Sequence, residues 1–237
     1  MEYDEARAAA YDLARPDRAA EAPAVADVIV ALALGGAVLE LGVGTGRLAV
    51  PLAERGVDVT GIDASPAMLD RLLAKTDKVS VVKGDVTDPT SLVDGPFALV
   101  LIAASTLFEL DDQDAQLGCL TGARSLLGAG GVVVVEAFAP DVTRADQSLA
   151  VVGTGADHLT MRAVRHDPLA QVVEGSDIVI DGDRVRLVPY RIRYITVPEL
   201  DLMARLAGLR LRERWGGWHH QPFTLASDSH VSVYERA

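Results

Sequence analysis

Three closely spaced glycines follow a short apolar run and constrain the fold more than any other part of the chain. The run covers 38–41, and the glycines are Gly42, Gly44 and Gly46. Glycine accepts positive φ angles and lets a ligand approach the backbone, because it has no Cβ atom. A strand, this turn and a helix-like segment over 48–55 predict a nucleotide-type cradle at the carboxyl edge of a parallel sheet. An ordinary glycine-rich turn between a strand and a helix is the alternative.

The spacing of these glycines differs from that of a dinucleotide site. The dinucleotide pattern is G-x-G-x-x-G, whereas here Gly46 comes one residue early and Arg47 takes the place of the third glycine. Glu40, two residues before the first glycine, is a poor neighbour for a pyrophosphate but a good one for an ammonium group. The pattern therefore disfavours a nicotinamide dehydrogenase and favours a ligand with an amino-acid moiety.

Two further acids lie at or near the ends of strand-like runs. Asp63 ends the run 57–63, 23 residues after Glu40. An acid at about this spacing accepts hydrogen bonds from both ribose hydroxyls in nucleoside-binding βαβ units. Asp85 belongs to a Gly-Asp pair in the run 79–86, and this pair is also common in turns, so a turn-capping role stays open.

Two nearly continuous apolar runs, 97–103 and 132–138, predict a fourth and a fifth strand that are covered on both faces. A helix is expected over 112–127, and the glycine-rich segment 128–131 is expected to break it before the fifth strand. Ser65, followed by Pro66, predicts the capped start of another helix.

Taken in order, E-x-G-x-G-x-G, D-x-S-x-x-M-L, G-D and L-L-x-x-G-G-x-V-V-V-E extend from 38 to 138. This series resembles class I S-adenosylmethionine-dependent methyltransferases that act on small molecules. The resemblance implies an α/β fold, with a Rossmann-like, seven-stranded, mostly parallel sheet, an antiparallel last strand and helices on both faces. It also implies a small antiparallel β insertion and an N-terminal helical lid. Ala98 departs from the family, which usually has an acid there, but this position lies away from the expected site.

The resemblance implies S-adenosylmethionine as the cofactor, with S-adenosylhomocysteine as its product. The methionyl end is expected against Glu40 and the glycine loop, the ribose against Asp63 and the adenine against Asp85. Met68 is explained equally well as a core methionine. The full set of expected cofactor contacts is Glu40, Gly42, Gly44, Thr45, Gly46, Arg47, Asp63, Ala64, Met68, Gly84, Asp85, Val86 and Ala103.

The composition limits the partners and the compartment. The chain of 237 residues has a formal net charge of −12, which disfavours nucleic acid, because neutralising phosphates requires a basic surface. The single cysteine, Cys119, cannot form an internal disulfide, which suits a reducing cytoplasm. The N-terminus lacks the order of a signal peptide, and no apolar run reaches the length of a membrane span. We expect no membrane association and either a monomer or a homodimer.

A single methyltransferase domain with four parts is expected. An N-terminal helical cap (1–36) precedes the cofactor-binding core (37–140). A substrate-covering β insertion (141–198) follows, and a helix with the last two strands (199–237) completes the domain. Inside the insertion, the step Asp181-Gly182 predicts a hairpin turn. The cap is expected to contain two helices, over 4–14 and 19–34.

Alternation of apolar and polar residues over 159–166, 171–180 and 184–194 predicts a small antiparallel sheet over the mouth of the cofactor site. Arg191 and Arg193 share a face of the last strand, where they could bind a carboxylate or a phosphate. A solvent-facing arginine pair is the alternative. The other candidate substrate contacts, for which ordinary packing is the alternative, are Tyr3, Tyr11, Phe108 and Trp218.

Methyl transfer from a sulfonium requires alignment of the nucleophile and, for some acceptors, a base. Histidine is the natural base near neutral pH. His166 lies beside Asp167 at a predicted strand end, which is either an oriented pair or a solvated strand end. His219 and His220 share a loop with both tryptophans, which forms either a substrate wall or a cap over the core. No clustered carboxylates indicate a metal, so none is expected.

The sequence therefore predicts methylation of a nitrogen or oxygen atom of a small-molecule acceptor. A protein of the same fold that binds S-adenosylmethionine without methyl transfer, as a pericyclase, a cyclase or a regulatory module, is the alternative function.

Overall fold

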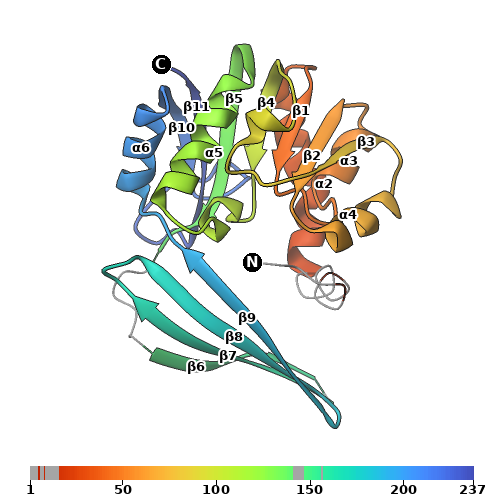
Figure 1. Cartoon of the computed structure of the whole chain (residues 1–237), viewed down its shortest axis with the longest axis vertical. Helices are drawn as coiled ribbons and strands as arrows, with labels where there is room; N and C mark the ends of the chain where they lie inside the picture. Colours follow the sequence, from red (N-terminus) through yellow and green to blue (C-terminus); the bar gives the residue numbers. More distant parts are fainter. Residues whose placement is uncertain (1–4, 6–7, 9–15, 141–146, 156) are drawn as a thin grey trace.

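The computed structural model describes residues 5, 8, 16–140, 147–155 and 157–237. Figure 1 shows two parts, a body of strands and helices and a long antiparallel sheet below it. None of the helices in these ranges is both long and apolar enough to cross a membrane.

The body is built on a seven-stranded sheet with the order β10-β11-β5-β4-β1-β2-β3. The five strands β5, β4, β1, β2 and β3 are neighbours in this order and pair in parallel. Strand β11 is antiparallel to both of its neighbours, β10 and β5. The predicted mostly parallel sheet with an antiparallel last strand is therefore confirmed. The strands are β1 (Val38–Leu41), β2 (Val59–Asp63), β3 (Val79–Lys83), β4 (Phe97–Ile102), β5 (Leu127–Phe138), β10 (Leu209–Trp215) and β11 (Ser229–Arg236).

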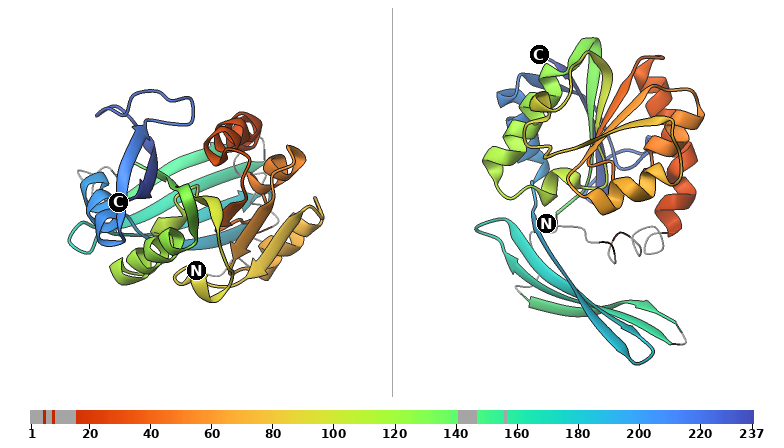
Figure 2. Two further views of the ribbon diagram at one scale, coloured as in Figure 1. Left: turned by 90° about the horizontal axis from the view of Figure 1, so that it is seen from above. Right: turned by 45° about the vertical axis from the view of Figure 1, so that its right-hand side comes forward.

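Helices cover both faces of this sheet (Figure 2, right). On one face α2 buries Val25 and Ile29 in an apolar cluster with residues of α3, α4 and the strands. On the other face α5 and α6 bury Leu120 and Met203 in a second cluster. Because the central strands are covered twice, they are apolar at nearly every position. The helices are α2 (Pro16–Ala33), α3 (Ala49–Glu54), α4 (Pro66–Leu73), α5 (Gln113–Ser125) and α6 (Val197–Leu206), with 3-10 turns η1 (Pro89–Ser91) and η2 (Thr106–Glu109).

Polar side chains cap the helices at the positions where the chain enters them. Ser65 Oγ accepts a hydrogen bond from the N–H of Met68 at 3.3 Å, at the predicted start of α4. Asp112 Oδ1 accepts one from the N–H of Ala115 at 2.8 Å at the start of α5. These caps satisfy N–H groups that the first turn of a helix leaves without a partner inside the helix.

The glycine-rich segment 128–131 belongs to β5, so the prediction that it separates the helix from the strand was wrong. Leu127 already pairs with Phe97, and the next pair joins Val132 to Leu99. The ladder is therefore irregular at the glycines, which fits their frequent occurrence at β-bulges. From the sequence alone, a run of glycines in a bulged strand cannot be distinguished from a loop.

The second sheet has the strand order β6-β7-β8-β9 and is antiparallel throughout. Alternation predicted its last three strands but not β6. Gly182 has a φ of +58°, as the predicted hairpin turn between β8 and β9 requires. The strands are β6 (Gln147–Thr154), β7 (His158–Asp167), β8 (Val172–Asp181) and β9 (Arg184–Arg193).

A buried arginine ties this small sheet to the body. Arg193, the last residue of β9, donates hydrogen bonds to Gln116 Oε1 of α5 at 2.6 Å and to Glu199 Oε1 of α6 at 2.7 Å. It also donates to Gln171 Oε1, just before β8, at 3.1 Å. Although burial opposes the change, the bonds from Arg193 and Gln171 hold the pKa of Glu199 below its ordinary value. One guanidinium thus joins two helices of the body to the small sheet.

Replacing Arg193 by Ala should lower the free energy of unfolding by about 3 kcal/mol, because it removes the cation beside the partly buried Glu199 and leaves the buried Oε1 of Gln116 without this donor. Arg191→Ala is the matched control, since the Arg191 side chain is 44% exposed against 11% for Arg193. The control substitution should lower the free energy of unfolding by less than about 1 kcal/mol. Urea unfolding of the two variants measures both values, and equal losses would contradict an anchoring role for Arg193.

Candidate functional site

Loops that follow the parallel strands converge at one edge of the body's sheet. After β1 the chain turns sharply, and the N–H groups of Gly42 and Val43 both donate to the carbonyl of Ile62, at 2.8 and 3.0 Å. Gly42 has a φ of +76°, and a Cβ atom there would lie 2.4 Å from Thr106 Cγ2. Gly44 has a φ of +53°, but no atom of the described residues lies within 4 Å of where its Cβ would be. The glycine loop is thus closed on the Thr106 side and open at Gly44.

Asp63 ends β2 beside this loop and holds it in place. Its Oδ2 accepts a hydrogen bond from the N–H of Gly44 at 2.8 Å, and its Oδ1 accepts one from the N–H of Ser65 at 2.9 Å. Burial raises the pKa of Asp63 above its ordinary value, and the two backbone N–H groups oppose the rise. A carboxylate accepts up to about four hydrogen bonds, so each oxygen keeps capacity for a ligand hydroxyl.

Glu40 lies within β1 and is only 4% exposed. Its Oε2 atom has no hydrogen-bond partner in the described part of the chain. Burial raises the pKa of Glu40 to about 8, Arg47 opposes the rise, and the carboxylates of Glu136 and Asp63 add to it. A buried acceptor without a donor is costly, so this oxygen is suited to a ligand that brings its own donor.

Glu136, at the end of β5, is a site residue that the sequence analysis did not select. Its Oε2 accepts hydrogen bonds from the N–H of Ala104 at 2.8 Å and from Arg47 Nη2 at 3.3 Å. Ala104 and Ser105 both have left-handed backbone angles, with φ of 54° and 66°. Such angles are costly without glycine, and they persist where surrounding contacts impose them. The sequence did offer a signal for Glu136, since it is the acid near the end of the fifth apolar run.

These contacts bring three carboxylates, those of Glu40, Asp63 and Glu136, into electrostatic contact at one strand edge. Glu40 interacts with each of the other two and with Arg47. Arg47 is the cation that the described residues contribute to this interaction, and it pairs with Glu136. An edge with more acids than bases favours a cationic ligand over a phosphate.

The other expected cofactor residues lie at the same edge but differ in exposure. Asp85 is exposed, and its Oδ1 accepts a hydrogen bond from the N–H of Thr87 at 2.9 Å, as in a capped turn. Met68, Val86 and Ala103 are buried. The three that lie in the turns after β1, β2 and β3 are Thr45, Ala64 and Gly84.

His166 is buried at 5% exposure, so the expectation of a solvated strand end was wrong. Its Nε2 lies 2.9 Å from the hydroxyl of Tyr194. Asp167, the neighbour considered as an orienting acid, uses its Oδ1 to accept from the N–H groups of Leu169 and Ala170, at 3.0 Å each. Burial raises the pKa of Tyr194, and nearby Asp167 adds to the rise. The structure thus pairs His166 with a tyrosine.

The loop between β10 and β11 packs against α2. Trp218 is buried in the apolar cluster on the α2 face, and the ring of His220 lies 3.8 Å from the ring of Trp215. His219 is exposed and pairs with Glu21 of α2 at 3.3 Å. These contacts agree with the alternative of a cap over the core. Within the described ranges, no three His, Cys, Asp or Glu side chains are grouped to hold a metal ion.

Several candidate substrate residues are occupied by other contacts. Arg191 donates to the carbonyl of Asp111 at 3.1 Å, and Arg193 is held in the buried network described above. Phe108 is fully buried and meets Phe138 edge to face, with ring centres 5.0 Å apart. The two remaining candidates, Tyr3 and Tyr11, lie outside the described residues, as does nearly all of the helix expected over 4–14.

Comparisons with known proteins agree with this geometry. Residues 38–131 match the methyltransferase domain family. The cypemycin N-terminal methyltransferase of a Streptomyces species is 31% identical, over 99% of this chain and 97% of its own. The CcbJ methyltransferase of Streptomyces caelestis is 39% identical with a TM-score of 0.86, covering 92% of this chain and 90% of its own. An amino pentose methyltransferase from Micromonospora, CalS10 with bound S-adenosylmethionine, has a TM-score of 0.72 at 22% identity, covering 93% and 92%.

The fold and the strand-edge site define a protein that binds a nucleoside-type, cationic cofactor. The unpartnered oxygen of Glu40, the open side at Gly44 and the remaining acceptor capacity of Asp63 fit S-adenosylmethionine. With a relative 31% identical over nearly its whole length, the chain belongs to the class I S-adenosylmethionine-dependent methyltransferases. S-adenosylmethionine is accordingly its cofactor.

The raised pKa of Glu40 predicts how stability depends on pH. Between pH 4.5 and about 8 the folded protein keeps a proton that the unfolded chain has lost, so the free energy of unfolding falls as pH rises. Glu40→Gln removes this dependence on pH. The free energy of unfolding of the variant should exceed that of wild type by about 3–5 kcal/mol at pH 8 and by little near pH 4.5.

Urea unfolding at several pH values measures this difference. Glu54→Gln, at an exposed position on α3, is the control and should show no such trend. If the difference in free energy of unfolding between wild type and Glu40→Gln stays constant with pH, or shrinks as pH rises, the raised pKa of Glu40 is refuted.

Proposed function

We propose that this enzyme transfers the methyl group of S-adenosylmethionine to a nitrogen atom of a small natural-product acceptor. The observation that carries the proposal is the near full-length similarity to a methyltransferase named for an N-terminal amine. An amine suits the site, because a deprotonated amine is itself a nucleophile, whereas a hydroxyl requires a strong base. Oxygen is the second acceptor atom to test.

The roles of the cofactor residues form part of the proposal. Glu40 accepts from the ammonium group of the methionyl end, and the open glycine loop lets that end lie against the backbone. Asp63 accepts from the ribose hydroxyls while it still holds Gly44 and Ser65. Asp85, near the end of β3, faces the adenine. The bound cofactor supplies an activated methyl on a sulfonium, and the chain orients the acceptor and excludes water.

Asp63→Ala should weaken binding of S-adenosylmethionine and S-adenosylhomocysteine roughly 30–100-fold, because it removes hydrogen bonds to a charged acceptor. Asp58→Ala is the matched control, since Asp58 is exposed before the other end of β2. Calorimetric titration with both ligands and with NAD measures the affinities. Mass spectrometry of amine and alcohol acceptors then detects the gain of one methyl group.

Each outcome separates the alternatives. If neither S-adenosylmethionine nor S-adenosylhomocysteine binds the folded protein, the assigned cofactor is wrong. Methylation of alcohols but not of amines would overturn the choice of nitrogen. Cofactor binding with no methyl transfer to any acceptor would favour a non-transferring protein of the same fold. A cytoplasmic location and the absence of nucleic-acid and membrane partners stay predictions from the sequence.

Of the three candidate histidines, His166 best fits a proton acceptor, because it is buried with a hydroxyl partner while His219 and His220 are exposed. His166→Gln should lower kcat about 100-fold and leave the affinity for S-adenosylmethionine unchanged. Raising the pH should restore part of the rate, because more of the acceptor amine is then deprotonated in solution. His219→Gln serves as the control. An unchanged kcat, or an equal loss of cofactor affinity, would show that His166 has only a structural role.

A further inference from the structure

The four-stranded sheet packs on the body with part of one face, and its other face carries exposed apolar side chains. Val164, His166 and Val173 point to the inner face and are buried against the body. The alternate positions form the outer face, where Leu149 is 66% and Leu187 is 64% exposed. Alternation along a strand sends successive side chains to opposite faces, so these leucines point away from the inner face. Among the outer positions, the last two arginines of β9 still bond to the body.

The apolar residues of the outer face are contiguous across all four strands. Val151 pairs with Met161, Met161 with Ile178, and Ile178 with Leu187, so one row crosses the sheet. A second row, formed by Leu159, Ile180 and Val185, lies beside it toward the hairpin tip. Monomeric proteins rarely expose an apolar patch of this extent unless it is an interaction site.

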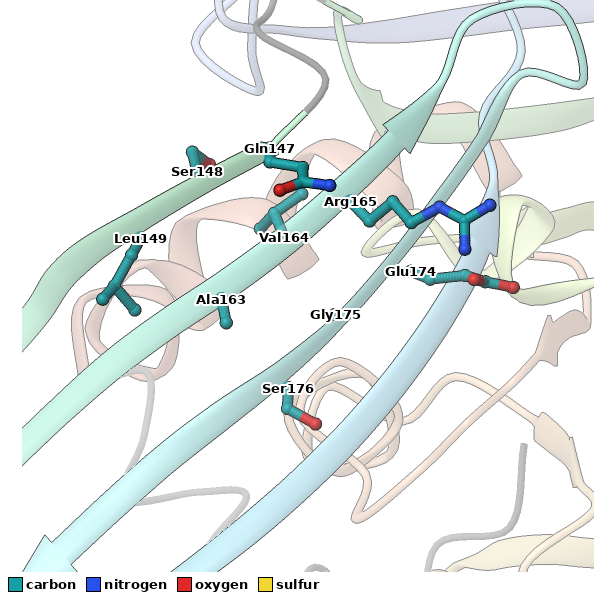
Figure 3. A pocket seen from close by; sticks show the side chains of 9 residues that line it. All are labelled: Gln147, Ser148, Leu149, Ala163, Val164, Arg165, Glu174, Gly175 and Ser176. Atoms are coloured by element: carbon teal, nitrogen blue, oxygen red, sulfur yellow. The ribbon is translucent and has the colours of Figure 1, made fainter.

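Next to these rows the outer face is hollowed. Figure 3 shows the hollow, where Leu149, Ala163 and Ser176 follow one another across β6, β7 and β8 and the charged residues Arg165 and Glu174 lie to one side. The hollow has a volume of about 560 Å³. It lies on the small sheet and not at the edge that holds the glycine loop. Side chains from a facing surface could therefore enter it without disturbing the cofactor site.

Charge and edge chemistry indicate how a partner would approach. Residues 147–193 contain six Arg and six Asp or Glu, so this segment is neutral in a chain of net charge −12. Two copies could meet here without the repulsion that their acidic remainder would cause elsewhere. Pro189 in the edge strand β9 has no backbone N–H, and β6 has a register irregularity after Val151. Both features disfavour edge-to-edge pairing and leave the face as the contact.

We propose that the outer face packs against the outer face of a second copy of this chain, giving a twofold dimer of stacked sheets. Ten-residue strands in a four-stranded sheet span roughly 600 Å² in projection. Two such faces together bury roughly 1,200 Å², without the additional area of protruding side chains, and this reaches the size of specific interfaces. Apolar rows on each copy then cover one another, as in the core of a β-sandwich.

Light scattering coupled to gel filtration tests this with the full chain. Wild type should have the mass of two copies, and Leu187→Glu should shift it to one. Leu225→Glu introduces the same charge at an exposed leucine outside the sheet and should leave the dimer intact. Leu187→Ser is a milder second variant and should raise the dissociation constant at least tenfold, measured by sedimentation equilibrium.

Folding and cofactor binding are followed separately, by circular dichroism and by titration with S-adenosylhomocysteine. A larger assembly supports the interface if Leu187→Glu splits it and the control does not. A monomeric wild type at tens of micromolar, or a Leu187→Glu or Leu187→Ser variant with wild-type assembly, overturns the proposal. None of these outcomes depends on whether methyl transfer to nitrogen is found.

Discussion

The carboxylate of Glu136 fixes the arrangement on which the rest of the site depends. It accepts from the backbone of Ala104 after β4 and from Arg47 after β1, so three strands are tied together at their carboxyl ends. Asp63 extends this connection to β2 through the N–H of Gly44. The loops are therefore positioned by side chains that belong to other strands, and a ligand meets a cradle that is already formed.

That arrangement is held at a cost in stability. Three acids gather at one edge, burial leaves one oxygen of Glu40 without a donor among the described residues, and two residues keep left-handed angles without being glycine. Features of this kind cluster where binding requires them. A cofactor that carries an ammonium and a sulfonium relieves the excess negative charge, so the same acids that disfavour the empty fold favour the complex.

Most of the body could be predicted because its signals are local. Each parallel strand is a continuous apolar run, and acids or glycines mark the strand ends, so β1 to β4 and the helix starting after Ser65 follow from the sequence. Two of the failures are nonlocal, and a third is an ambiguity of local composition. The burial of His166 and the occupation of Arg193 depend on elements 28 and 77 residues away, Tyr194 and Gln116. The glycines of 128–131 looked like a loop because a bulged strand has the same composition.

The small sheet shows how one segment can serve two surfaces. Its inner face contributes Val164, Val173 and Tyr194 to the body's apolar cluster, so that face fixes the sheet beside the cofactor edge. Its outer face carries the row from Val151 to Leu187, whose two end residues are 59% and 64% exposed. Because the side-chain period of a strand is two, substitutions that alter one face leave the other unchanged. The self-association proposed for the outer face can therefore change without altering the inner face that packs on the body.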